Sequence, residues 1–191
     1  MVCLYMKGTR SNRSDISLAV IHLTGNRGNV SALDALISIL GQQRIRASTA
    51  SGFIKCGHSA TCFTEMPLTA IQMLVDHSKS TKHPYEGYGV AIHKIHVFKQ
   101  GARPVIYLPN NEAYWLPEEQ RWRHVRFEYG DIDFTHEREW RSPGDFMLDQ
   151  SFGYYVIVQN LECETKILSS LGYRPKGVLG FVHMQTLKDF F

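Results

Sequence analysis

The chain has 191 residues, of which 43% are hydrophobic and 20% charged, proportions that exclude a wholly disordered protein. Its net charge of +3 is unevenly distributed, because residues 1–95 carry ten Lys/Arg against five Asp/Glu. This basic N-terminal half either suits a polyanionic ligand or is an unevenly charged, solvated surface. The length fits one domain over residues 1–191. Four scattered cysteines indicate reduced thiols, and the early charge at Lys7 argues against a secretory signal. Since no apolar run approaches ~20 residues, we expect a cytoplasmic protein without a membrane span.

The first predicted elements are a strand over residues 18–24 and a helix over residues 31–40. The strand is apolar and β-branched, and its period of two places Val20, His22 and Thr24 on one face. The turn at residues 25–28 contains two glycines; it is either an ordinary turn or one whose N–H groups face a phosphate. Ser31 and Asp34 resemble a capping box at the start of the helix.

The later elements are mostly short strands. A strand over 60–64 precedes a helix that begins near Pro67, and we expect helices within 110–128 and over 163–171. The remaining predicted strands cover residues 88–93, 104–108, 137–141, 154–158 and 177–182. Because the strands and helices do not alternate regularly, this order predicts an α+β protein rather than a βαβ repeat.

Metal and cysteine chemistry find little support in the sequence. Cys56, His58 and Cys62 lie close together, but no second ligand pair follows at the usual spacing of a zinc site. We therefore predict no metal. Cys62 falls inside a predicted strand, where a small thiol more often packs than reacts. Glycine-rich phosphate-binding motifs are absent.

Two groups of polar residues are better candidates for a site. His22 and Thr24 share one face of an otherwise apolar strand, and residues 135–141 hold five ionisable side chains. Strand alternation would put Glu137, Glu139 and Arg141 on one face. These residues are either an exposed strand with cross-strand ion pairs or a carboxylate held ionised against an arginine, able to stabilise positive charge on a substrate.

At these residues the sequence resembles two bacterial protein families. The segments Cys62-Phe-Thr-Glu-Met-Pro-Leu68, Tyr88-Gly-Val-Ala-Ile92, Gly101-Ala-Arg-Pro-Val-Ile-Tyr107 and Glu137-Arg-Glu-Trp-Arg141 resemble AbiGi-like abortive-infection proteins. The opening Ile21-His-Leu-Thr24 and the segments that follow it are similar to the start of DarT-type ADP-ribosyltransferases. Together the resemblances span roughly residues 18–160.

The resemblance implies an ADP-ribosyltransferase-like split β-sheet with flanking helices, which clasps NAD as a substrate. It implies Glu139 as the catalytic carboxylate, with Glu137 as the alternative. Residues implied to bind NAD are His22 (also catalytic), Thr24, Arg46, Thr64 and Tyr88. The chain departs from the DarT pattern after the second strand, where Glu65-Met-Pro67 replaces an arginine, so Arg46 is the candidate substitute.

The leading functional hypothesis is a bacterial anti-phage toxin that transfers ADP-ribose to nucleic acid, RNA or DNA, and is restrained by an antitoxin protein. Arg121-Trp-Arg-His-Val-Arg126 interleaves basic and aromatic residues, which suits backbone contact and stacking, or is an amphipathic helix with solvated arginines. A second hypothesis is a non-catalytic antitoxin of an abortive-infection pair. A third is an NAD glycohydrolase that uses water as the acceptor.

Overall fold

The computed structural model describes residues 17–48, 54, 57–78 and 85–190. Seven strands build its central sheet: β1 (Ala19–Gly25), β3 (Ala60–Thr64), β4 (Tyr85–His93), β5 (Arg103–Pro104), β8 (Glu139–Pro143), β10 (Tyr154–Val158) and β11 (Val178–His183). Their order is β11-β10-β4-β1-β3-β8-β5, and only β10 and β11 run parallel. The expected α+β class is confirmed as a mostly antiparallel sheet with flanking helices.

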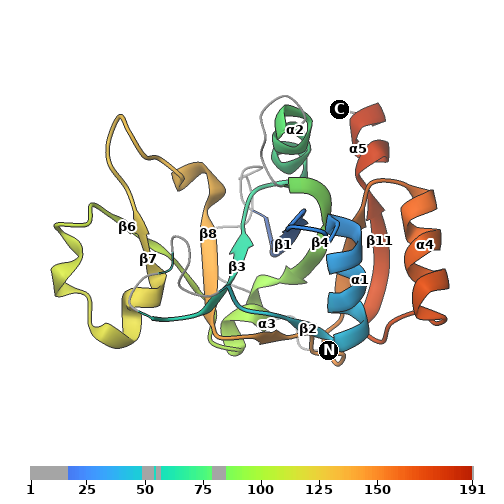
Figure 1. Ribbon diagram of the computed structural model, residues 1–191, viewed down its shortest axis with the longest axis horizontal. Coiled ribbons are helices and arrows are strands. Elements are labelled where there is room, and N and C mark those ends of the chain that lie inside the picture. Colours follow the sequence, from blue (N-terminus) through green and yellow to red (C-terminus); the bar gives the residue numbers. More distant parts are fainter. Residues whose placement is uncertain (1–16, 49–53, 55–56, 79–84, 191) are drawn as a thin grey trace.

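Five α-helices flank the sheet within the described residues: α1 (Ala32–Gln42), α2 (Leu68–Ser78), α3 (Lys94–Lys99), α4 (Leu161–Leu171) and α5 (Met184–Phe190). Figure 1 shows α4 at one end of the molecule and α2 above the sheet. A small antiparallel sheet joins β2 (Arg44–Ile45) to β9 (Phe146–Met147). Among the described residues, no helix combines the length and the apolar character that crossing a bilayer requires.

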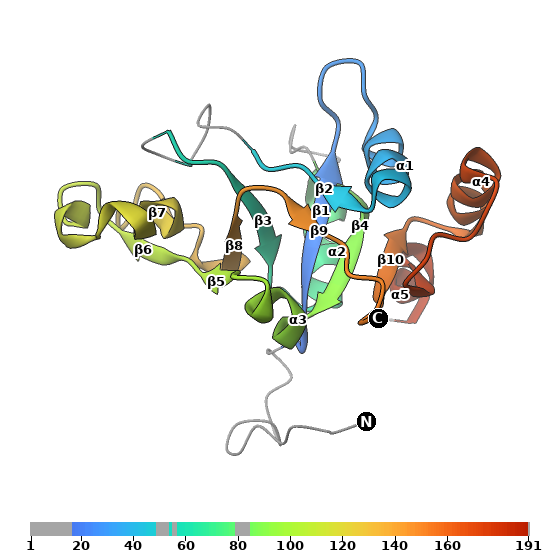
Figure 2. The same ribbon diagram turned by 90° about the horizontal axis from the view of Figure 1, so that it is seen from below.

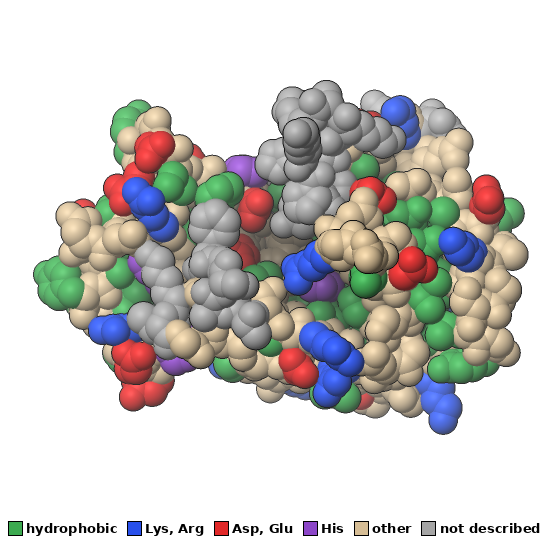
Figure 3. Space-filling view, viewed as in Figure 1, with side chains coloured by type: hydrophobic (Ala, Val, Ile, Leu, Met, Phe, Trp, Pro, Cys, Tyr) green, Lys and Arg blue, Asp and Glu red, His purple; other side chains and the backbone are tan. Residues whose placement is uncertain are grey.

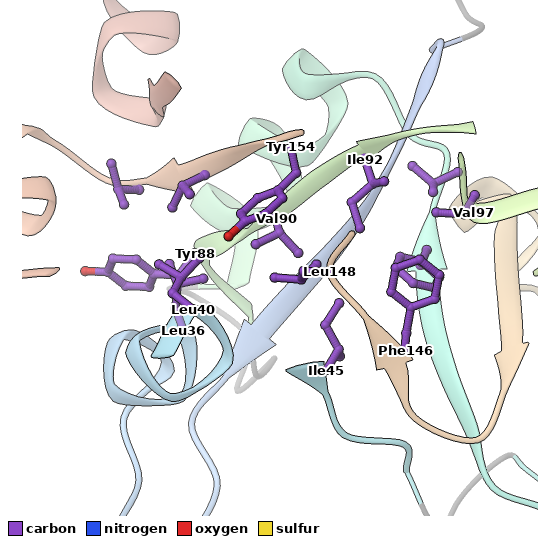
Figure 4. Close-up of a cluster of buried hydrophobic side chains, with 14 of the residues drawn as sticks. Leu36, Leu40, Ile45, Tyr88, Val90, Ile92, Val97, Phe146, Leu148 and Tyr154 are labelled. Atoms are coloured by element: carbon purple, nitrogen blue, oxygen red, sulfur yellow. The ribbon is translucent and has the colours of Figure 1, made fainter. Parts of the chain in front are cut away.

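Each face of the sheet has its own hydrophobic core. On one face, α1 packs Leu36 and Leu40 toward Tyr88 and Val90 of β4, as Figure 4 shows, with Phe146 in the same cluster. The opposite face carries a smaller cluster that includes members of α2 and α5; its buried residues are Ile21, Met66, Ile71, Val75, Ala91, Ile157 and Met184. We call these the α1 face and the α2 face.

The junction of β1 and α1 follows the sequence pattern closely. Ser31 caps the helix, because its Oγ accepts from the backbone N–H of Asp34 at 3.1 Å. Thr24 is 5% exposed, and its hydroxyl donates to the carbonyl oxygens of Ala32 at 2.8 Å and Tyr88 at 3.2 Å. Thr24 therefore ties the end of β1 to both α1 and β4.

A lobe of residues 106–134 projects from the β8 side of the sheet. It holds β6 (Ile106–Leu108) paired in parallel with β7 (His124–Arg126), and the 3-10 helices η1 (Ala113–Trp115) and η2 (Glu118–Arg123). Figures 1 and 2 both show β6 and β7 at the end of the molecule opposite α4. The helices expected within 110–128 are these two short 3-10 turns.

Two predicted strands differ from the observed ones. The predicted strand over 104–108 is divided between β5 and β6, which belong to different sheets. The predicted strand over 137–141 begins later, because η3 (Thr135–Glu137) and a left-handed Arg138 with φ 45° precede β8. Glu137 therefore lies outside the strand that holds Glu139 and Arg141, and the expected alternation of all three is wrong.

Replacing Thr24 tests its role as a tie between elements. Thr24→Val keeps the side-chain shape but leaves two buried carbonyl oxygens without this donor, so we expect a loss of about 1–3 kcal/mol in the free energy of unfolding. Urea denaturation followed by circular dichroism measures it. Thr24→Ser, which keeps the hydroxyl, is the control and should lose less. Equal stability of Thr24→Val and the parent would contradict this role.

Candidate functional site

The strand register divides the predicted site residues between the two faces of the sheet. Ile21 lies opposite Thr64, and Thr64 lies opposite Glu139, so Thr64 and Glu139 share the α2 face. His22 is one residue on from Ile21 and projects to the α1 face, where its ring meets Phe63 edge-on at 6.0 Å. The structure therefore brings Thr64 and Glu139 together but leaves His22 on the other side of the sheet.

Glu139 is held by an arginine two residues along the same strand. Arg141 donates from Nε to Oε1 of Glu139 at 2.7 Å and from Nη2 to Oε2 at 3.2 Å, a bidentate pair. The Arg141 side chain is 2% exposed and that of Glu139 12%. The interpretation of residues 135–141 as a carboxylate held against arginine is confirmed in geometry, and the interpretation as an exposed strand is wrong.

Arg141 also joins the sheet to the lobe. Its Nη1 donates to the backbone oxygens of Trp122 and His124, each at 3.0 Å. Burial alone would lower the pKa of Arg141, but the charge of Glu139 and its hydrogen bonds outweigh burial and raise it. The guanidinium therefore stays charged.

The Glu139–Arg141 pair is surrounded by Cys62, Tyr107 and Thr64. Burial, followed by the negative charge of Glu139, raises the pKa of the Cys62 thiol to about 12, so it is not a thiolate nucleophile at neutral pH. The Tyr107 hydroxyl accepts from the backbone N–H of Glu139 at 3.1 Å and donates to Phe134 O at 3.2 Å. Burial raises the Tyr107 pKa to about 12, so this hydroxyl keeps its proton.

The surface is hollowed beside this region. Figure 3 shows a hollow between the β6–β8 side of the molecule and the side that carries α1 and α2, with acidic side chains in it. Thr64 is half-buried at the end of β3, and its hydroxyl donates to Glu137 O at 2.6 Å while accepting from Met66 N at 3.1 Å. Thr64 thus fixes the backbone beside Glu139 as well as facing the same side of the sheet.

His22 is a neutral, internally bonded histidine. Its Nδ1 lies 2.8 Å from the backbone oxygen of Cys62, and because a carbonyl only accepts, Nδ1 carries the proton of the neutral ring. Burial lowers the pKa of His22, and the nearby charge of Arg27 lowers it further. His22 therefore stabilises the pairing of β1 with β3.

The other expected NAD-binding residues also lie apart from Glu139. Thr24 and Tyr88 are register partners on the α1 face, where both are buried. Tyr88 Oη lies 3.3 Å from Cys163 Sγ, and burial, followed by that thiol, raises the Tyr88 pKa. Arg46 is exposed and donates to Gln42 Oε1 at 3.2 Å. None of these contacts reaches Glu139.

The basic and aromatic segment 121–126 is engaged within the chain. Trp122 is buried, and its Nε1 donates to Glu119 O at 2.7 Å. Arg121 pairs with Glu118 and Arg126 with Glu128. The segment is a 3-10 turn followed by a strand, not an amphipathic helix, and Trp122 does not offer a ring for base stacking.

The structure holds a second charged cluster, on the α1 face, that no local sequence pattern predicts. Glu65 accepts from Trp140 Nε1 at 2.7 Å and pairs with Lys94 Nζ at 2.5 Å. Trp140 and Glu65 are 75 residues apart in sequence, so only the pairing of β3 with β8 brings them together. The one sequence signal for this cluster is that Glu65 and Trp140 both lie in segments that carry the family resemblance.

The zinc candidates do not form a complete site among the described residues. No group of three or more His, Cys, Asp or Glu side chains that could hold a metal ion occurs there. His58 lies 3.6 Å from Glu118, and Cys62 is half-buried beside Glu139. Cys56 lies outside the described residues.

The lowered pKa of His22 predicts a pH dependence of stability. An unfolded chain protonates its histidine near pH 6.5, whereas the buried ring resists protonation, so the free energy of unfolding should fall as the pH drops below about 6.5. Urea titrations between about pH 7.5 and 5 measure this. His22→Asn keeps a donor for Cys62 O and should flatten the profile; His96, whose pKa burial also lowers, leaves a residual slope. Identical profiles for parent and variant would contradict the account.

Removing Arg141 tests the buried ion pair. Arg141→Met leaves the Glu139 carboxylate unpaired and two lobe carbonyls without their donor, so we expect a loss of roughly 3–5 kcal/mol in stability. The control, Arg126→Met, breaks the more exposed pair with Glu128 and should cost about 1 kcal/mol or less. Equilibrium urea denaturation measures both variants. Similar losses for the two would contradict the importance of the buried pair.

Comparison with known proteins provides no relative from which a role for these residues can be transferred. No protein-family model matches the chain, and neither a curated protein nor a solved structure matches it. What Glu139 and its neighbours do chemically is therefore argued from their geometry.

Proposed function

We propose that the chain is an NAD-dependent ADP-ribosyltransferase of the bacterial defence-toxin type, with Glu139 as its acidic catalytic residue. The observation that carries the proposal is the Glu139 carboxylate, fixed by two hydrogen bonds from a buried guanidinium yet still partly open to the surface. A carboxylate fixed in this way keeps its position without reorganising. The resemblance of residues 137–141 to the family motif adds to this support.

The reaction needs a fixed negative charge beside the ribose. Breaking the bond between the ribose C1′ and the nicotinamide nitrogen leaves positive charge on the ribose as neutral nicotinamide departs. The acceptor nucleophile then forms a bond to C1′ and loses a proton to Glu139 or to water. Tyr107 stays protonated and holds the backbone N–H of Glu139, which favours one orientation of the strand at this point.

The proposal narrows the set of participating residues. Thr64 shares the α2 face with Glu139 and is the neighbour suited to line the NAD pocket. His22, Thr24 and Tyr88 belong to the α1 face and are assigned structural roles, and Arg46 has no contact with this site. The split-sheet arrangement of the family is likewise proposed here, with the hollow seen in Figure 3 as the NAD cleft. The proposed acceptor is nucleic acid, in the bacterial cytoplasm.

A second candidate is a non-catalytic antitoxin that binds and restrains a partner. The observation that favours it is the division of the predicted residues between two faces, together with a carboxylate whose two oxygens already have donors. A shallow depression lies along α4, lined by Leu161, Glu162, Thr165, Lys166 and Ser169, at the opposite end of the molecule from the lobe.

Labelled NAD distinguishes the candidates. The purified protein is incubated with adenylate-labelled NAD and with RNA, DNA or lysate, and we expect label on nucleic acid that falls by about a hundredfold or more in Glu139→Gln. Glu137→Gln, two residues away and outside β8, is the matched control and should retain activity. The double variant Glu139→Gln/Arg141→Met removes both charges together and should also be inactive.

The products decide between the alternatives. Free ADP-ribose without labelled macromolecule would assign the NAD glycohydrolase activity instead. No NAD consumption, together with harmless expression and rescue of cells from a co-expressed toxin, would assign the antitoxin role. Loss of activity in Glu137→Gln but not in Glu139→Gln, with both variants folded, would contradict the assignment of the carboxylate.

A further inference from the structure

Two arginines lie side by side where the central sheet meets the lobe. Arg103 opens β5, the edge strand that leads into the lobe, and Arg123 ends η2 within the lobe. Figure 2 shows β5 between α3 and the lobe. Both side chains are half-buried, and Nε of Arg123 donates to Pro104 O at 3.0 Å, one residue along the chain from Arg103. We call these two residues the arginine pair.

Backbone oxygens hold the Arg103 guanidinium in place. Its Nη1 donates to Phe98 O at 2.8 Å and to Ala102 O at 2.7 Å, and the group lies over the Phe98 ring, 3.7 Å from the ring centroid. Phe98 O belongs to the last turn of α3, and the C-terminal end of a helix favours a cation. Among the described residues these bonds use only Nη1, so the N–H groups of Nε and Nη2 can serve a further acceptor.

The Arg123 guanidinium is fixed in a similar way. Besides its bond to Pro104 O, it donates from Nη1 to Gln120 Oε1 at 3.2 Å. Nη2 of Arg123 makes no hydrogen bond to another described residue. The amide nitrogen of Gln120, which is a donor, lies on the side chain that Arg123 already contacts. Both arginines therefore keep donors beside the same short stretch of β5.

No carboxylate balances the arginine pair within the part of the chain that the structure describes. Two acids of the adjoining η2 and β8 have other partners: Glu118 pairs with Arg121, and Glu139 is bound by the arginine two residues along its strand. Burial and the like charge of Arg103 lower the pKa of Arg123, the opposite of what an acidic partner does. Two adjacent positive charges thus lack an internal counter-charge there.

The donors and the charges of the arginine pair suit a phosphate dianion. A carboxylate has two oxygens, and one guanidinium can occupy both, as Arg141 does with Glu139. A phosphate group with a free end has three or more acceptor oxygens and a charge of about −2 above neutral pH. It can accept from both guanidinium groups and balance both charges. A phosphodiester carries one charge on each phosphorus and balances only half of the pair.

We infer that Arg103 and Arg123 form a binding site for a phosphate dianion, either inorganic phosphate or the phosphate monoester of a small metabolite, at the joint between sheet and lobe. Because Arg103 belongs to β5 and Arg123 to the lobe, the bound anion bridges the two. It therefore stabilises the lobe against the sheet, close to Arg141, which is the register partner of Arg103. The inference is independent of the proposed transferase function, since neither NAD nor Glu139 takes part in the binding.

Isothermal titration calorimetry of the full chain with inorganic phosphate and with glycerol phosphate measures the binding. The buffer has low salt, no sulfate and a pH of about 8, at which both ligands are dianions. We expect saturable binding of each ligand at one site, and Arg103→Gln and Arg123→Gln should each weaken it by about tenfold or more. Tighter binding of glycerol phosphate would identify the ligand as a monoester, and equal binding would identify it as the free ion.

Hydrogen exchange tests whether the anion bridges sheet and lobe. Saturating phosphate should slow the exchange of backbone amides in residues 118–126 of the parent by several-fold, because a ligand that binds only the closed arrangement reduces local opening. The same phosphate should leave the exchange of Arg103→Gln unchanged. Unchanged exchange in the parent with phosphate bound would overturn the bridging role.

Arg121→Gln is the matched control, because it removes from the same 3-10 helix a guanidinium that already has an acidic partner. It should bind phosphate like the parent. The inference is overturned if the parent shows no binding at about 10 mM phosphate, or if Arg121→Gln weakens binding as much as Arg103→Gln. Equal binding of dimethyl phosphate, a monoanionic diester, would also overturn it.

Two further measurements keep the test decisive. Circular dichroism checks that each variant folds, and Arg103→Lys, which keeps the charge but loses the planar fork, replaces Arg103→Gln where that variant does not fold; it too should bind phosphate more weakly than the parent. The comparison of inorganic with dimethyl phosphate uses the parent alone. Because binding is measured without NAD, loss of label transfer with phosphate binding intact counts against the proposed function alone.

Discussion

The buried charge of Arg141 is the constraint on which the arrangement of lobe and sheet depends. A guanidinium that is 2% exposed is costly unless its donors are satisfied. Glu139 supplies the opposite charge, and the backbone oxygens of Trp122 and His124 supply the other acceptors. Because those oxygens belong to the lobe, these hydrogen bonds fix the lobe against β8 at Arg141. The same contacts position the one carboxylate on which the proposed chemistry relies.

The register of β1 against β3 decides which polar residues meet. Ile21 lies opposite Thr64, which puts the Thr64–Glu139 pair on the α2 face and His22 on the α1 face. A shift of one residue would reverse this, because successive side chains of a strand point to opposite faces. The two faces therefore separate the charged site from the residues that tie β1 to α1 and β4.

The sequence pattern predicted individual helices and strands better than the contacts between them. β3 and the capped start of α1 were predicted closely, since alternation, turn residues and capping are local signals. Arg138 in the left-handed region was unexpected, because nothing in its neighbours marks the late start of β8. The Glu139–Arg141 pair was foreseen as a possibility, being separated by two residues. The clusters of Glu65 with Trp140, and of Arg103 with Arg123, needed strand pairing and loop packing that no local pattern encodes.

Stability alone is a weak reason for the Glu139–Arg141 pair. A buried ion pair recovers little more than the desolvation of its charges, and well-packed apolar residues often stabilise a protein as much. What apolar residues cannot supply is a carboxylate held in a fixed position. Arg141 holds the Glu139 side chain in place, and Tyr107 fixes its backbone. β5 pairs directly with β8 and ends the order of the sheet on that side, so this carboxylate is carried one strand from the sheet's edge, where the lobe begins.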